Sequence, residues 1–65
     1  MSYEVFQSKV NAMIARAGGG IHVRFFAEEG RFIARCSDGT TITTNTSCPR
    51  VKVRWGSGHV AYATI

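Results

Sequence analysis

The chain has 65 residues, of which 45% are hydrophobic and 18% charged, so there is room for one small domain over residues 1–65 and the composition excludes disorder. Lys and Arg number 8 against 4 Asp and Glu, and the formal net charge of +4 favours an acidic partner. No apolar run approaches the ~18 residues of a membrane span, and the N-terminus has no signal-peptide pattern. We therefore expect a cytoplasmic protein with no membrane partner.

Two cysteines and two histidines are the only candidate metal ligands besides carboxylates. Cys36 and Cys48 are too few for a secreted disulfide framework, so both thiols are expected to be reduced. Their spacing, with His22 and His59 scattered, matches no zinc-binding pattern. The sequence predicts no metal and no cofactor.

An amphipathic helix is predicted near the start of the chain, over about residues 3–17. Ser2 is a suitable N-cap, because its hydroxyl can accept a hydrogen bond from the first turn. Glycines 18–20 end the helix; a phosphate-binding loop would instead lie between a strand and a helix. Apolar residues recur at intervals of three and four, which draws one stripe along the helix: Tyr3, Phe6, Val10, Met13, Ile14 and Ala17.

Short strands are predicted after the glycines. Within each, apolar residues alternate with polar ones, the pattern of a strand with two different faces, and turn-forming residues separate the strands. The fold class is therefore α+β, with one N-terminal helix packed on one face of an antiparallel sheet of about five short strands. These strands cover about residues 21–27, 31–36, 40–45, 50–55 and 59–64.

The turn Ser37-Asp38-Gly39 determines one strand register. A three-residue loop with Gly39 in the left-handed region pairs Cys36 with Thr40 and Ala34 with Ile42, which keeps the apolar residues on one face. A two-residue loop would divide them between two faces, because a slip of one residue inverts every side chain. The three-residue loop is preferred.

The turn at residues 56–58 determines the last register. A two-residue loop at Gly56-Ser57 is expected, which pairs Val53 with Val60 and Val51 with Tyr62. Tyr62 and Trp55 would then lie in the core under the helix, and neither would be available for stacking on a ligand.

These registers divide the side chains between two faces of the sheet. The face under the helix would be almost free of charge, while Phe26 and Ile33 would add exposed apolar surface to the opposite face. Six of the 8 basic residues fall on that opposite face, together with His22 and with His59 beside Arg54: Arg24, Arg31, Arg35, Arg50, Lys52 and Arg54.

The leading hypothesis is a small basic binding module that uses this arginine-rich face to bind nucleic acid, DNA or RNA, or a nucleoprotein complex. Guanidinium groups contact phosphates and an exposed aromatic ring stacks on bases. The phosphate contacts are assigned to Arg24, Arg35, Lys52 and Arg54, the stacking to Phe26, and the rim to Arg31, Arg50 and His59.

Four alternatives remain open. The same face could dock on an acidic protein surface, as a protein-binding inhibitor or adaptor of the kind that mobile elements encode, or it could form a homodimer. The arginine stems could simply cover the second face of the sheet and bind nothing. His22 and His59 could serve as base and acid of a small ribonuclease, although no catalytic motif is present and we expect a protein that is not an enzyme.

Overall fold

The computed structural model describes residues 2–45 and 50–64, and it confirms the α+β class. Within this part of the chain, the helix is too short and too polar to cross a membrane. The elements are α1 (Tyr3–Arg16), β1 (Val23–Glu28), β2 (Arg31–Cys36), β3 (Thr41–Asn45), β4 (Arg50–Arg54) and β5 (Val60–Thr64). Cys48 and the proline that follows it lie outside the described residues.

Helix α1 begins as the sequence predicts. The Oγ atom of Ser2 accepts a hydrogen bond of 3.2 Å from the backbone N–H of Val5, so the N-cap is confirmed. The last turn ends at Arg16, where a positive charge interacts favourably with the helix dipole. Phe6 and Val10 are buried, so the apolar stripe of the helix faces the sheet.

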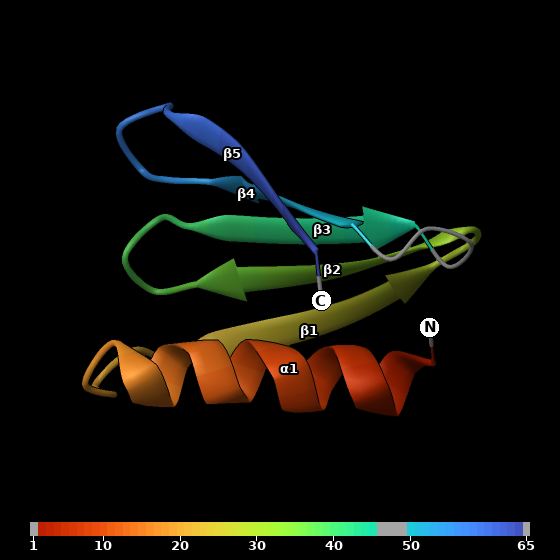
Figure 1. Ribbon diagram of the computed structural model, residues 1–65, viewed down its shortest axis with the longest axis horizontal. Helices are drawn as coiled ribbons and strands as arrows, with labels where there is room; N and C mark the ends of the chain where they lie inside the picture. Colours follow the sequence, from red (N-terminus) through yellow and green to blue (C-terminus); the bar gives the residue numbers. More distant parts are fainter. Residues whose placement is uncertain (1, 46–49, 65) are drawn as a thin grey trace.

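The five strands form one antiparallel sheet in the order β1-β2-β3-β4-β5, so every strand pairs only with its neighbours along the chain. Helix α1 lies beside β1 in Figure 1, and the sheet extends away from it toward β5. Strand β5 runs obliquely and crosses in front of β4 and β3 in this view, as expected of a strongly twisted sheet.

The core lies between α1 and one face of the sheet. Phe6 packs edge-on against Phe25, at 6.1 Å between ring centroids, and against Phe32 at 5.7 Å. The ring of Tyr3 lies 5.2 Å from that of Phe32 on the other side. The remaining buried members come from four elements: Val10, Ala34, Ile42, Val51 and Val53. One face of the sheet is thus used for packing, and no helix formed by residues 2–45 and 50–64 covers the opposite face.

The predicted register between β2 and β3 is confirmed. Ala34 pairs with Ile42, and the backbone N–H of Cys36 donates to the carbonyl oxygen of Thr40 at 2.8 Å. Gly39 has a φ of +92°, the left-handed conformation that the third residue of such a loop requires.

The predicted register between β4 and β5 is wrong by one residue. The backbone N–H of Trp55 donates to the carbonyl oxygen of His59 at 2.9 Å, and Val53 pairs with Ala61 rather than with Val60. The cause is a third loop residue: Gly58 has a φ of +93°, and its N–H donates to the carbonyl oxygen of Trp55. The turn therefore repeats the geometry of the loop at residues 37–39.

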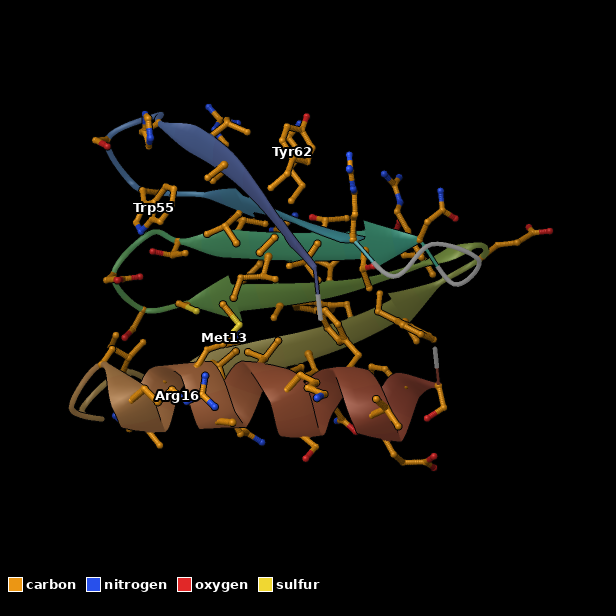
Figure 2. The ribbon with its side chains drawn as sticks, viewed as in Figure 1. Met13, Arg16, Trp55 and Tyr62 are labelled. Atoms are coloured by element: carbon orange, nitrogen blue, oxygen red, sulfur yellow. The ribbon has the colours of Figure 1, made fainter. Side chains whose placement is uncertain are left out.

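The observed register places the side chains of β5 on the faces opposite to those predicted, because side chains alternate along a strand. Tyr62 pairs with Lys52 and is 67% exposed on the face away from α1, so it is not a core residue. Trp55 remains on the helix side but is 41% exposed, so its expected core role holds only in part. Figure 2 shows Tyr62 directed away from α1 and Met13 directed from α1 toward the sheet.

Candidate nucleic-acid interface

The face of the sheet away from α1, which we call the open face, carries three rows of side chains that run across the strands. Antiparallel pairing aligns residues of neighbouring strands within each row. The central row is Phe26, Ile33, Thr43, Lys52 and Tyr62. The three-arginine row is Arg24, Arg35, Thr41, Arg54 and Val60. The two-arginine row is Glu28, Arg31 and Asn45, continued on β4 by Arg50.

All six predicted strand cations lie on the open face, three in the three-arginine row, two in the two-arginine row and Lys52 between them. Lys9 and Arg16, the other two of the 8, belong to α1. The sequence therefore predicted the positive charge of this face correctly, since β1 to β4 have the expected alternation.

The three-arginine row brings like charges together. Arg24 of β1 stands directly opposite Arg35 of β2, a pairing that destabilises a sheet by up to about 1 kcal/mol. Both side chains are exposed, and the only ion pair among residues 2–45 and 50–64 involves neither of them. This row is therefore a concentration of uncompensated positive charge.

The two-arginine row contains the single acidic side chain of the open face. The Nε atom of Arg31 donates to Oε2 of Glu28 at 2.9 Å, and both groups are exposed. Strand β1 extends to Glu28, one residue beyond the predicted end, which is why this carboxylate reaches the open face. Arg31 is consequently partly neutralised, and a rim position suits it better than a central one.

The central row supplies the apolar and aromatic part of the face. Phe26 is 42% exposed, and the guanidinium carbon of Arg35 lies 5.7 Å from the centroid of its ring, a cation–π contact. Ile33, expected to be exposed, is instead only 9% exposed. It stands between Phe26 and Thr43 in the row, with an arginine two residues away on either side, and long arginine stems cover apolar surface.

Two hollows, each of about 350 Å³, open on this face and share Thr43 and Lys52. One is bordered by Arg31, Arg50 and Tyr62 among others. The other is bordered by Arg35, Thr41 and Arg54. Their size is near the lower limit of small-molecule sites, and each combines positive charge with hydroxyl groups that can donate to phosphate oxygens.

Tyr62 is the aromatic residue of this face that the sequence analysis missed. Its assignment to the core followed from the two-residue loop at 56–57. The signal that would have corrected it is Gly58, which occupies the same third loop position as Gly39. Applying one turn rule to both hairpins would have moved Tyr62 beside Lys52.

His59 is a correction in the opposite direction. It was predicted to lie on the basic face, but it pairs with Trp55, and their rings are 5.3 Å apart between centroids. His22 precedes β1 and His59 precedes β5, so the two histidines flank strands at opposite edges of the sheet. The structure therefore does not bring together the pair on which a ribonuclease reading depended.

Metal coordination finds no support in the described residues. Nowhere in residues 2–45 and 50–64 do three His, Cys, Asp or Glu side chains converge. Cys36 is half-buried, and burial raises the pKa of its thiol, with the nearby Asp38 carboxylate as a second cause. The thiol is accordingly a weak nucleophile and a weak ligand at neutral pH.

A different surface lies on the helix side of the sheet. Met13, Ile14 and Ala17 of the helical end form one wall of an apolar hollow of about 270 Å³, and Trp55, Ala61 and Ala63 belong to its opposite side. The small side chains of β5 leave room for this hollow, since Ala61 and Ala63 stand where the predicted register put Val60 and Tyr62.

Comparison of the chain with models of protein families, with curated proteins and with solved structures found no match. The geometry and charge of the open face are therefore the features that bear on function.

Proposed function

We propose that this protein is a binding module and that its open face binds nucleic acid. The observation that carries the proposal is the segregation of charge: Arg24, Arg31, Arg35, Arg50, Lys52 and Arg54 share one face with a single carboxylate. A solubilising charge would need no such segregation, and the direct opposition of Arg24 and Arg35 costs stability. A polyanion relieves that repulsion, because each phosphate can accept from a guanidinium group.

The test is a titration against labelled DNA and RNA oligomers, single- and double-stranded, at about 50 mM and about 200 mM salt. The wild-type protein is compared with the double variant Arg24→Glu/Lys52→Glu, which removes cations from two rows of the open face. The control is Lys9→Glu/Arg16→Glu, which changes the net charge equally but on α1.

We expect salt-sensitive binding by the wild type, and a salt slope that falls by about 2 in the open-face variant, because two phosphate contacts are lost. The α1 variant should keep a slope close to that of the wild type. Thermal unfolding should show that all variants fold. Absence of binding at low salt would contradict the proposal and favour an acidic protein surface as the partner.

A further inference from the structure

We infer that the nucleic acid is single-stranded and lies along the central row, with bases stacked on Phe26 and Tyr62; this inference rests on the proposed function. Phe26 and Tyr62 are the two exposed aromatic residues of the open face. The pairings Phe26 to Ile33, Ile33 to Thr43, Thr43 to Lys52 and Lys52 to Tyr62 place them at opposite ends of one row.

The length of the row indicates how a strand would occupy it. Four inter-strand steps of roughly 4.8 Å separate Phe26 from Tyr62, which gives roughly 19 Å along the sheet. At the ~3.4 Å spacing of stacked nucleotides this is about six nucleotides, and fewer if the strand is extended. Such a site falls within the ~4–16 nucleotides that single-strand binding folds occupy.

The charges on both sides of the row fit a backbone that follows it. Arg35 and Arg54 lie on one side, Arg31 and Arg50 on the other, and Lys52 lies within the row between the two hollows. A strand whose bases face the aromatic rings would place its phosphates within reach of one arginine row or the other. Thr43 adds a hydroxyl donor at the centre.

A duplex does not fit this surface equally well. Bases in a duplex are already stacked, so they cannot stack on Phe26 or Tyr62 without being flipped out. A row of roughly 19 Å across five strands is also wider than the ~12 Å major groove. Helix α1, the element that could enter a groove, packs Phe6 and Val10 against the other face. A duplex could therefore contact only the arginines and Lys52, through its phosphates.

The two rings are not equivalent. Arg35 covers part of Phe26 through the cation–π contact, whereas Tyr62 is 67% exposed and borders a hollow together with Arg31 and Arg50. A base reaching Tyr62 has a free ring face and two guanidinium groups beside it. We therefore assign the larger stacking contribution to Tyr62.

The experiment compares single-stranded oligomers of about 12 nucleotides, oligo(dT) and oligo(U), with duplexes of the same length, using fluorescence anisotropy. The variant is Tyr62→Leu, and the matched control is Trp55→Leu, which removes an exposed aromatic ring from the other side of the sheet. Thermal unfolding of each variant confirms that it is folded before titration.

Single strands should bind more tightly than duplexes, and Tyr62→Leu should weaken single-strand binding by roughly 5- to 100-fold, the effect of losing one stacked base. Duplex binding should stay unchanged in this variant, and Trp55→Leu should alter neither. Comparison of oligo(dT) with oligo(U) distinguishes a DNA ligand from an RNA ligand.

Equal affinity for single strands and duplexes, unaffected by Tyr62→Leu, would overturn the inference while leaving the arginine face as a nucleic-acid site. Absence of salt-sensitive binding to either form would instead overturn the proposed function itself. A loss of affinity in Trp55→Leu equal to that in Tyr62→Leu would also overturn the assignment, because the two rings lie on different faces.

Discussion

The carboxylate of Asp38 closes the turn between β2 and β3, since its Oδ1 atom accepts a hydrogen bond of 2.9 Å from the backbone N–H of Thr40. This hydrogen bond lowers the pKa of Asp38, because it stabilises the ionised form. A group whose pKa is lower in the folded state contributes stability above its unfolded pKa of about 3.9, and the contribution is lost as the pH falls through the folded value.

A pH dependence follows for Asp38. The wild type should be more stable than Asp38→Asn at pH 7, and the difference in Tm should shrink as the pH falls below the unfolded pKa of about 3.9 and through the lower folded value. Thermal unfolding of both proteins from about pH 7 to about pH 3 measures this. A difference in Tm that stays constant over the range would contradict it.

Single residues also show where sequence reasoning succeeds and where it does not. The N-cap at Ser2 and the exposed Phe26 follow from local pattern and are found as expected. The burial of Ile33 on the open face could not be predicted from alternation, because it depends on how long side chains from neighbouring strands lie over it.

Among the elements, the hairpin of β4 and β5 determines whether Tyr62 belongs to the site. Alternation predicted strand β5 correctly. It does not show which residues of β5 face α1, because one additional loop residue exchanges the two faces of the strand. The sequence of β5 offers apolar residues in both registers, so hydrophobicity could not choose between them. The register is determined by Gly58, whose left-handed conformation makes it the third residue of the loop.

The turns of the two hairpins pack against each other, backbone to backbone. A Cβ atom added to Gly56 would lie 2.9 Å from the carbonyl oxygen of Asp38 and 3.7 Å from the Cα atom of Gly39. Neither neighbour is a flexible side chain, so one of the turns would have to move. Gly56 is thus required for contact between the β2–β3 turn and the β4–β5 turn.

Gly56→Ala should therefore lower the free energy of unfolding by about 1–3 kcal/mol, the usual cost of overpacking. Urea denaturation measures the change, with Ser57→Ala in the same loop as a control that should alter stability little. If Gly56→Ala unfolded at the same urea concentration as the wild type, the close packing of the turns would be wrong.

In the molecule as a whole, packing of α1 on one face of the sheet stabilises the fold, whereas repulsion between like charges on the open face lowers the stability. The opposition of Arg24 and Arg35 is the clearest instance. Functional surfaces commonly carry such a cost, because the groups that bind a ligand repel one another in its absence.

Arg24→Thr should consequently raise stability at low salt by about 0.2–1 kcal/mol and weaken nucleic-acid binding at the same time. Thermal unfolding at about 10 mM and about 1 M salt tests the first part, because screening should abolish most of the gain at high salt. The control Arg24→Lys keeps the charge and should show no gain. A stabilisation that persists in 1 M salt would point to strand propensity instead of charge.

The order of the strands also has a kinetic consequence. Because each strand pairs only with the next along the chain, the four hairpin contacts of the sheet form between segments that are already near one another. Little chain entropy is lost in closing such short loops, and a low contact order favours rapid folding compared with sandwiches built from distant pairings. A sheet that assembles this quickly leaves the inner strands β2, β3 and β4 without their partners only briefly, which limits the time available for misassociation before folding is complete.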